Sequence, residues 1–499
     1  MGLFYLLTII SAVISFISFA PFKFEWLIFI GIIPLFFVLD KLKTKTKQLN
    51  KFIKFKHYFY VSIIYGTIYM GLTNVWTFQL IEFSSLLEII ILFFTYTIFQ
   101  TLFYVLIICL FGMCNSPLIL FPCYWIIFEY IKALGSFGSP NGILGYCLSN
   151  NYLAEYANYG GVYLVSLIIL IINYIIYIFI KNGFSMSNFR KQVIILITLI
   201  TILIAPKLIN IQPTSINKSI NIGLIQVNHP ISYKYIASNR RNIRNDYISL
   251  SKKAISTSDL DLIIWPETIT ASENLKFPLF MSQVHYLSNL NDTGFIFGTP
   301  RQSQNMYFNS AVLVYKNLTL FYDKNHLMPF GEYWPGKSIF KLLQLDNFIP
   351  GAEFSKGTTK NVFNFKSIKL GIGICLETTM GFFYRDYTQK NVDILISLVN
   401  NAWFKSSSIA ARQLQMVQLR AIETGLPILQ SSNMGFTCII EPDGSIINTL
   451  PQFEQNFLTH SLDLKSINTI YKKVGDLIIL ISLILILINL AIKRYYLKS

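Results

Sequence analysis

A lone cysteine at the end of an apolar run is the residue in this chain best suited to nucleophilic chemistry. The run from Ile368 to Glu377, IKLGIGICLE, combines glycines with β-branched residues, which predicts a buried strand. Its last residues include Cys375, and functional side chains gather at the carboxyl ends of strands in α/β folds. A free cysteine in such a run is more often a small core residue, so the run alone leaves both roles open.

A thiol is a good nucleophile only as the thiolate, so Cys375 needs a nearby base or positive charge. Two other stretches carry such groups: DLIIWPE ends on Glu267, and YDKNHLMPFGEYWP contains Lys324. A glutamate at an apolar strand end can be partly desolvated, which raises its proton affinity, and a lysine can stabilise an oxyanion. The competing interpretation of Glu267 is a solvated residue at a strand end.

Histidine is the other residue type that could activate the thiol. The chain has five, of which four are in settings that indicate no catalytic role: His57, His229, His285 and His460. His326 lies two residues from Lys324 and would share a face with it in an extended chain, so it stays open as an alternative base.

The composition predicts that part of the chain lies in lipid. Of 499 residues 53% are hydrophobic, and the mean hydropathy of +0.50 exceeds what a soluble core needs. A net charge of +16 suits anionic lipid headgroups as well as nucleic acid, and the apolar content favours the membrane, so we expect no nucleic-acid partner. The six cysteines show no CxxC spacing, which argues against a disulfide framework or a zinc site.

Eight apolar segments are long enough for membrane spans, which need roughly 20 residues. The first ends in SFA, as a signal peptide can, but no basic residue precedes it, so we expect a retained span. The predicted spans are 1–20, 24–39, 58–77, 86–111, 116–134, 161–180, 193–210 and 475–492.

Basic loops predict the orientation. Lysine and arginine cluster at 41–56, at 181–191 and at 493–498. By the positive-inside rule these three stretches lie in the cytoplasm, which places both termini inside and the segment between the last two spans outside.

That outside segment, about 210–468, has the composition of a soluble α/β domain. Polar stretches at 239–258 and 408–424 predict helices, and DGS at 443–445 predicts a hairpin turn. The predicted strands are INIGLIQV, DLIIWPE, TGFIFGTP, SAVLVY, IKLGIGICLE, DILISLVN, LPILQSSN and GFTCIIEP. We therefore predict a membrane domain with seven transmembrane helices (1–210), a catalytic domain (211–470), and an eighth transmembrane helix with a cytoplasmic tail (471–499).

Taken together, the motifs resemble the carbon-nitrogen hydrolase (nitrilase) superfamily. The WPE, the KNHLMPFGE and the C-x-E of this chain look like its Glu-Lys-Cys triad in the same order, and NNAWF at 400–404 also matches. The resemblance implies a multi-span α-helical membrane domain plus an α/β nitrilase-like (αββα sandwich) extracytoplasmic domain. Eight spans around such a domain resemble a membrane-embedded acyltransferase branch of the superfamily.

The resemblance also implies site residues. Glu267 would be the general base, Lys324 would stabilise the oxyanion of the tetrahedral intermediate, and Cys375 would carry an acyl group as a thioester. The implied supporting residues are Glu332, which holds the lysine or assists the base, Glu377, an acid near the nucleophile, and Trp403, an aromatic residue beside the site. Glu332 could equally be a surface turn residue, and packing is the simpler role for Trp403.

Three positions depart from the family pattern. Leu376 stands where an aromatic residue is expected, Asn401 where aspartate is usual, and Lys405 where glycine is usual. These changes leave the triad intact and bear on loop shape and substrate fit. In the fifth apolar segment Glu129 would be expensive in lipid, so we expect it to face protein or water.

The implied reaction is a ping-pong acyl transfer in the bacterial inner (cytoplasmic) membrane, with the catalytic domain on the periplasmic side. Its partners would be a phospholipid acyl donor, a diacylglyceryl apolipoprotein acceptor and membrane lipids, with no metal or diffusible cofactor. Loops near 332–335 and 403–404 are expected to form an apolar rim that excludes water. A membrane-anchored amidase or nitrilase-type hydrolase, and a transport or scaffold protein with an inactive domain, remain the alternatives.

Overall fold

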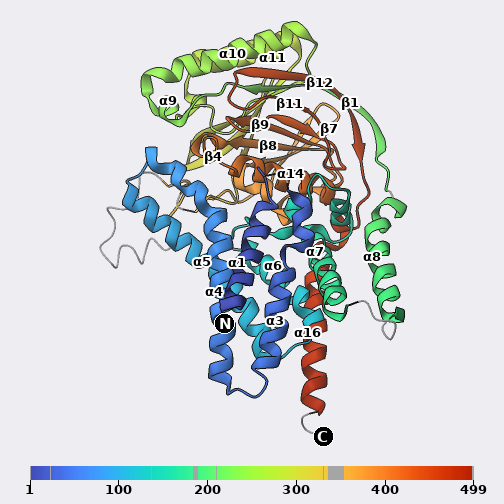
Figure 1. Cartoon of the computed structure of the whole chain (residues 1–499). Coiled ribbons are helices and arrows are strands. Elements are labelled where there is room, and N and C mark those ends of the chain that lie inside the picture. The colour runs from blue at the N-terminus through green and yellow to red at the C-terminus, as the bar shows by residue number, and fades with distance from the viewer. Residues whose placement is uncertain are drawn as a thin grey trace.

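A helical bundle carries a two-sheet α/β domain at one of its ends (Figure 1). The structure is a computed structural model. It describes residues 2–22, 24–135, 138–183, 189–209, 211–329, 331–334 and 353–496.

The helices of the first half coincide with the predicted apolar segments. All eight segments overlap a helix, the second one through two helices separated by Ile32. The helices of the bundle are α1 (Gly2–Ile17), α2 (Ile28–Gly31), α3 (Ile33–Lys45), α4 (Lys51–Asn74), α5 (Leu86–Met113), α6 (Phe121–Ala133), α7 (Ala157–Asn182), α8 (Phe189–Ile209) and α16 (Leu477–Tyr496).

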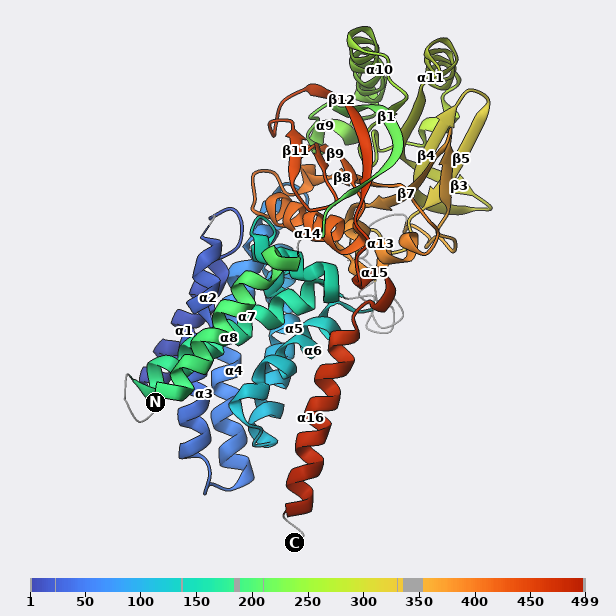
Figure 2. The ribbon, with the colours of Figure 1, turned by 90° about the vertical axis from the view of Figure 1, so that its right-hand side faces the viewer.

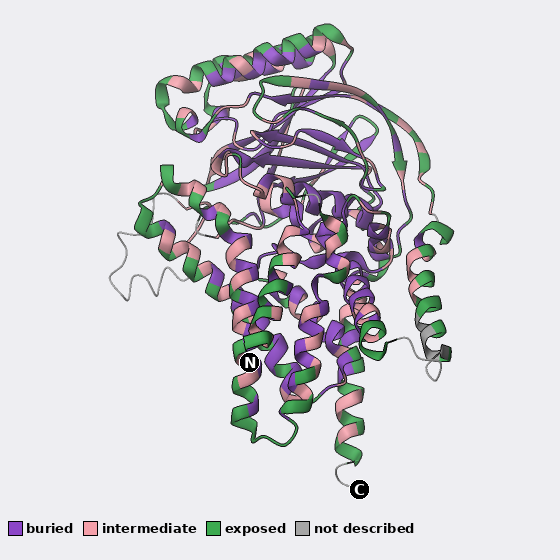
Figure 3. Cartoon of the chain, in the orientation of Figure 1, coloured by how far each residue is buried: buried purple, intermediate pink, exposed green. Residues whose placement is uncertain are grey.

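Three described helical stretches are long and apolar enough to cross a membrane: Leu86–Met113, Tyr152–Asn182 and Leu477–Tyr496. Along α5 the exposed apolar side chains recur every three or four residues, at Leu87, Ile91, Phe94, Ile98, Leu102, Leu106 and Leu110. Such a stripe on one helix face is typical of contact with lipid. The outer surfaces of the helices are accordingly mostly exposed, while their inner faces are buried (Figure 3).

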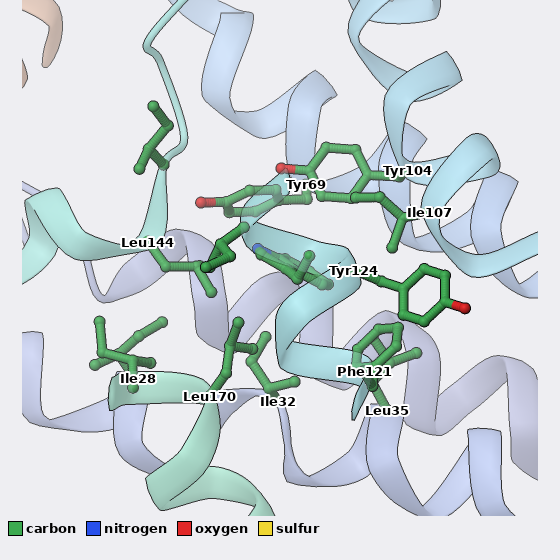
Figure 4. Close-up of a cluster of buried hydrophobic side chains, with 14 of the residues drawn as sticks. Ile28, Ile32, Leu35, Tyr69, Tyr104, Ile107, Phe121, Tyr124, Leu144 and Leu170 are labelled. Carbon is green, nitrogen blue, oxygen red and sulfur yellow. The ribbon is translucent and has the colours of Figure 1, made fainter. Parts of the chain in front are cut away.

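The interior of the bundle is apolar and aromatic. Ile28, Leu35, Tyr69, Tyr104 and Phe121, from five different helices, are buried in one cluster (Figure 4). Glu129 of α6 is buried beside it and accepts hydrogen bonds from the Trp125 indole at 3.0 Å and the Leu144 backbone at 2.9 Å. Glu129 therefore faces protein, as predicted.

The α/β domain contains two six-stranded sheets in its described residues, in the orders β12-β1-β2-β3-β4-β5 and β11-β10-β9-β8-β7-β6. In each sheet a parallel pairing in the centre meets antiparallel strands at the edges. The strands are β1 (Thr214–Gln226), β2 (Leu262–Ile264), β3 (Gly294–Ser303), β4 (Met306–Tyr315), β5 (Leu318–Asp323), β6 (Val362–Phe365), β7 (Ile368–Ile374), β8 (Ile394–Asn400), β9 (Ile428–Asn433), β10 (Cys438–Ile440), β11 (Ile446–Thr449) and β12 (Asn456–Ser466).

The two sheets pack face to face with helices outside them (Figure 2). Apolar residues of both sheets share one core between the layers, and a second core lies between the first sheet and its helices. The helices of this domain are α9 (Ile231–Tyr235), α10 (Arg240–Thr257), α11 (Pro278–Asn291), α13 (Gly381–Thr388), α14 (Ile409–Thr424) and α15 (Tyr471–Val474). This is the αββα sandwich that the resemblance implied, and α14 lies between the second sheet and α7 of the bundle.

Candidate active site

Glu267 lies just beyond β2, held beside β3. The fully buried LII of β2 continues into a segment whose backbone still bonds β3, through Trp265 to Ile296 and Ile269 to Gly298. At Gly298 an added Cβ would lie 2.6 Å from the Cα of Glu267, so only glycine permits this approach. Glu267 is buried, with 7% of the residue exposed.

Lys324 follows directly after β5. Its backbone N–H donates to the Asn309 carbonyl on β4 at 2.9 Å, and its own carbonyl accepts from Gly357 at 2.8 Å. The side chain is only 1% exposed. A buried ammonium is stabilised by anionic partners, and the neighbouring carboxylates supply them for Lys324.

Cys375 follows β7 and begins a short 3₁₀ turn, η10 (Cys375–Thr379). Its φ of +52° lies in the left-handed region, which is uncommon for a residue with a Cβ and is found at sharp turns and functional sites. The Thr378 hydroxyl donates to the Cys375 carbonyl at 2.7 Å. The turn brings the thiol out of the strand, so Cys375 is half-buried whereas Ile374 before it is fully buried.

The structure brings the three predicted triad residues together. The Lys324 ammonium lies 3.5 Å from Glu267 Oε1 and 2.9 Å from the Glu332 carboxylate. The charges of Glu267 and Lys324 both act on the Cys375 thiol. Asn309 Nδ2 donates to Glu267 Oε1 at 2.8 Å and to Glu332 Oε1 at 2.6 Å, which joins the two carboxylates.

Burial and charge set the proton affinities of the triad. Burial raises the pKa of Glu267, and the Glu332 charge raises it further against the opposing effect of Lys324. The pKa of Lys324 is raised despite its burial, because Glu332 and Glu267 stabilise its charge. Burial and the Glu267 charge raise the pKa of the Cys375 thiol. The resting site therefore holds a neutral thiol next to a carboxylate that binds protons more strongly than an ordinary glutamate.

Glu377 links the nucleophile turn to the lysine loop. One carboxylate oxygen accepts from the Tyr322 hydroxyl at 2.7 Å and from the backbone N–H groups of Asn325 and His326 at 2.6 and 2.9 Å. The other accepts from the Ile374 N–H at 3.0 Å. Burial raises the Glu377 pKa to about 7, against the effect of Lys324 and these donors. Glu377 thus ties the end of β5 to the end of β7, and with them Lys324 to Cys375.

Glu332 contacts two residues of the candidate site. Besides Lys324 and Asn309 it accepts a hydrogen bond from the Met328 N–H at 2.6 Å, and its side chain is 11% exposed, so it lies in a turn that faces the predicted triad. Trp403 is half-buried, and its ring contacts Phe83 at 5.0 Å and Tyr235 at 5.8 Å.

Within the described residues, the side chains expected to form an apolar rim join the α/β domain to the helical bundle. Phe404 contacts Trp76 at 5.1 Å, in the segment between α4 and α5, just as Trp403 contacts Phe83. Of the other predicted rim segment, Tyr333 and Trp334 are half-buried and Pro335 lies outside the described residues.

The His326 side chain packs against α13. Its ring packs against Phe382 at 5.2 Å and Phe383 at 5.9 Å, both on α13, and burial lowers its pKa to about 4. The residue contributes its backbone N–H to Glu377. Among the described residues no group of three or more His, Cys, Asp or Glu is arranged to hold a metal ion.

Sequence reasoning missed several residues of the site. Asn309 lies within a strand, where an asparagine gives no functional signal.

A chain of polar side chains also reaches the nucleophile. Ser432 donates to Asn401 Oδ1 at 3.0 Å, Asn401 Nδ2 to Gln413 Oε1 at 2.8 Å, and Gln413 Nε2 to the Cys375 carbonyl at 3.4 Å.

The other two departures from the family pattern, Lys405 and Leu376, have contacts that the structure describes. Lys405 has a φ of +44°, a conformation that glycine adopts more easily, and its ammonium forms an ion pair with Glu82 of the bundle. Leu376 is half-buried and packs against the core between the sheets.

Comparison with known proteins agrees with this arrangement. Residues 221–472, just over half of the chain, match the family model described as carbon-nitrogen hydrolase. The chain belongs to the carbon-nitrogen hydrolase family. A second family model, the apolipoprotein N-acyltransferase N-terminal domain, matches residues 11–175 of this carbon-nitrogen hydrolase family member.

Two curated relatives span most of this family member. The apolipoprotein N-acyltransferase of Shewanella oneidensis is 28% identical over 381 residues, which cover 73% of this chain and 71% of the relative. The apolipoprotein N-acyltransferase 1 of Treponema denticola is 25% identical over 531 aligned positions, which cover 95% and 94%. Among solved structures, a carbon-nitrogen hydrolase superfamily protein from Xanthomonas campestris aligns with 49% of this chain and 91% of its own, at 15% identity and a TM-score of 0.39.

Proposed function

We propose that the protein transfers an acyl chain from a membrane phospholipid to the α-amino group of a diacylglyceryl-cysteine at the N-terminus of an apolipoprotein. The observation that carries the proposal is that one chain contains both a candidate catalytic cluster and a membrane-type helical bundle. A Glu-Lys-Cys cluster, with Glu267 and Lys324 buried and Cys375 half-buried, lies at one end of a helical bundle that matches the apolipoprotein N-acyltransferase N-terminal domain. Its relatives bear the same name, and the three long apolar helices suit lipid substrates.

In the first half-reaction Cys375 takes the acyl chain. Its thiol proton passes to the Glu267 carboxylate while sulfur attacks the ester carbonyl of the donor. The oxyanion that forms is stabilised by the Lys324 ammonium. The ester C–O bond then breaks, Glu267 returns the proton to the departing oxygen, and a lysophospholipid leaves while the thioester remains on Cys375.

In the second half-reaction the amine of the acceptor attacks the thioester carbonyl. Glu267 takes a proton from the attacking nitrogen, and Lys324 again stabilises the oxyanion. When the C–S bond breaks, the sulfur regains a proton from Glu267 and the acceptor leaves as an amide. Glu332 and Asn309 keep the lysine and the base in place throughout.

The supporting roles follow from contacts. Glu377 positions both the lysine loop and the nucleophile turn. Trp403 and Phe404 form part of a rim, shared with Phe83 and Trp76 of the bundle, that would keep water from the thioester.

A bacterial inner-membrane location with eight spans is part of the proposal. The basic side chains of Lys43, Lys54 and Lys493 all donate to the connection at 114–116, at the end of the bundle away from the sheets. The first turn of α1 and the last turn of α16 lie toward that end as well (Figure 2). A basic end is expected on the cytoplasmic side, so this distribution supports a periplasmic catalytic domain with cytoplasmic termini.

Acid quenching followed by mass spectrometry tests the proposal. The full chain, purified in detergent, is incubated with dipalmitoyl phosphatidylethanolamine, and the expected product is a palmitoyl thioester on Cys375 that persists until a diacylglyceryl-cysteine peptide is added. Cys375→Ala should abolish both the adduct and transfer. Transfer by this variant would overturn the proposal.

The same experiment separates transfer from hydrolysis. If the chain were an amidase or nitrilase-type hydrolase, the thioester would decay to free palmitate without an acceptor. Absence of any adduct on a folded wild-type chain would indicate an inactive domain.

A further inference from the structure

One buried lysine near the site has no partner. Four lysines are buried among the described residues: Lys54, Lys132, Lys234 and Lys324. Three of them hydrogen-bond to protein groups, namely Lys54 to Asn115, Lys132 to the Asn141 carbonyl and Lys324 to its two carboxylates. Lys234 is 2% exposed, and its ammonium has no hydrogen-bond partner within the described part of the chain.

Lys234 lies near the glutamate of the site. It lies on α9, which follows the carboxyl end of β1, and β1 pairs in parallel with β2, the strand that leads to Glu267. The charges of Lys234 and Glu267 lie close enough to act on each other. The next residue, Tyr235, contacts the Trp403 ring at the rim.

The other buried cation of the site, Lys324, already has partners at the reacting centre and is not available to a phosphate. Lys324 is shared by Glu267 at 3.5 Å and Glu332 at 2.9 Å, and its charge is needed for the oxyanion. An unpaired buried ammonium is unfavourable, and burial lowers the Lys234 pKa to about 7. Among the described residues, Lys234 is therefore the one buried lysine whose ammonium could donate all of its hydrogen bonds to an anion that enters the site.

We propose that Lys234 binds the phosphodiester of the acyl donor while Cys375 attacks the donor's ester. This inference rests on the proposed function. A phospholipid carries its phosphate on the same glycerol as its esters, so a cation near the reacting carbonyl can reach it. Lysine binds phosphate through charge-assisted hydrogen bonds, which makes Lys234 a residue that selects phospholipids over neutral lipids.

Two donors with identical acyl esters provide the test. Dipalmitoyl phosphatidylethanolamine carries the phosphodiester, and dipalmitoylglycerol lacks it. Thioester formation on Cys375 of the detergent-solubilised full chain is followed by acid quench and mass spectrometry. We expect kcat/KM for loading from the phospholipid to exceed that from dipalmitoylglycerol by about tenfold or more, as a hydrogen bond to a charged group would give.

Variants then assign this preference to Lys234. Lys234→Gln should reduce the ratio of the two kcat/KM values toward one, mainly through a higher KM for the phospholipid, and Lys234→Arg should restore it. The control is Lys276→Gln, which removes an exposed lysine of the same domain that pairs with Glu273 and should leave the ratio unchanged.

Several results would overturn the inference. Equal loading from both donors by the wild-type chain rejects it without any variant, while the proposed function stands. An unchanged ratio in Lys234→Gln rejects it as well. An equal fall with both donors would show that Lys234 acts through Glu267 rather than on phosphate. If the wild-type chain loads from neither donor, the proposed function fails together with the inference.

Discussion

Two carboxylates and one ammonium share the buried centre of the site, and this ratio decides how protons move there. With Glu267 and Glu332 both ionised, Lys324 neutralises only one of them. Transfer of the thiol proton to Glu267 moves the negative charge to sulfur, still within the influence of the same ammonium. The proton therefore moves between groups that share one counter-ion, which keeps the cost of charge separation low.

The pH dependence of thioester formation should show an acidic limb set by Glu267. This carboxyl group must be ionised to accept the thiol proton, and its pKa is raised above the ordinary value of 4.5. Loading should thus fall as pH drops through that raised pKa. Lys324 stays protonated to a higher pH than a free lysine, so it adds no loss on the alkaline side near neutrality. Initial rates of Cys375 acylation between pH 4 and 9 would check this, and a rate that rises toward acid pH would contradict it.

Asn309 should matter nearly as much as the residues it joins. Asn309→Leu removes the amide that donates to both carboxylates. Without this donor, the two negative charges of Glu267 and Glu332 repel each other more strongly. Hydrogen bonds to charged groups are worth about 1.5–3 kcal/mol, so we expect kcat for acylation to fall about 10- to 100-fold. Asn364→Leu, at an exposed position on β6, is the matched control and should keep full activity. Equal activity of the two variants would exclude a role for Asn309.

Sequence alone could single out Cys375, Glu267 and Lys324 as candidates, and the resemblance to the carbon-nitrogen hydrolase superfamily joined them as a predicted triad. A cysteine and a glutamate that each end a buried apolar run, and a lysine in a motif rich in turn residues, stand out. Asn309 and Lys234 could not be found this way, since asparagine and lysine are common throughout this chain and neither lies in a distinctive motif. The His326 alternative needed the fold, because only the packing against α13 shows where the ring points.

At the scale of elements, apolar runs located the central strands better than the edge strands. All eight predicted runs coincide with strands, and the predicted turn at 443–445 joins β10 to β11. The strands that were missed are β5, β6, β11 and β12. Edge strands expose one side of the ladder, carry more polar residues and are often short, so their periodicity is weak. The second sheet ends in two such strands of four residues each.

The loop at Asn401 and helix α14 together hold the turn that begins at Cys375. This arrangement explains why Asn401 is compatible with the fold. The amide of Asn401 donates to Gln413 Oε1, which orients Gln413 so that its Nε2 faces the Cys375 carbonyl. Ser432 completes the chain on the other side. A residue with only acceptors at 401 could not orient Gln413 in this way.

Asn401→Asp, although it introduces the residue usual in the family, should therefore lower activity in this chain. Gln413 would have to turn its Nε2 toward the new carboxylate and present Oε1 to the Cys375 carbonyl, which it cannot bond. We expect about a tenfold fall in the rate of Cys375 acylation, as loss of one buried hydrogen bond implies. Gln413→Leu should show a similar fall with Asn401 intact. Wild-type rates in both variants would show that the amide chain does not position the nucleophile.

At the scale of the molecule, the sandwich is joined to the bundle through α14. Glu423, buried on this helix, accepts from the Val162 N–H of α7 at 2.8 Å and from Arg420 at 2.8 Å. The contact falls where α7 loses helical geometry at Gly160 and Gly161, which leaves a backbone N–H free to donate outward. Such a pairing joins residues 261 positions apart, which no local pattern predicts.

The orientation of the whole molecule yields the last prediction. Basic side chains from three helices meet at the end of the bundle away from the sheets, and the turn at Asp443 lies in the catalytic domain. If the positive-inside rule holds, a cysteine at Asp443 faces the periplasm and one at Lys47 faces the cytoplasm. Both positions are exposed, and only Cys114 and Cys375 of the native cysteines are not buried.

Asp443→Cys and Lys47→Cys, each in a chain with Cys114→Ser and Cys375→Ala, should therefore react differently with a membrane-impermeant maleimide. In spheroplasts we expect labelling of the first variant alone, and after lysis labelling of both. The unsubstituted parent controls for reaction of buried thiols. Labelling of Lys47→Cys in intact spheroplasts, with Asp443→Cys protected, would place the sandwich in the cytoplasm. Cys375 would then face the inner leaflet, and an acceptor exported across the membrane could not reach the thioester.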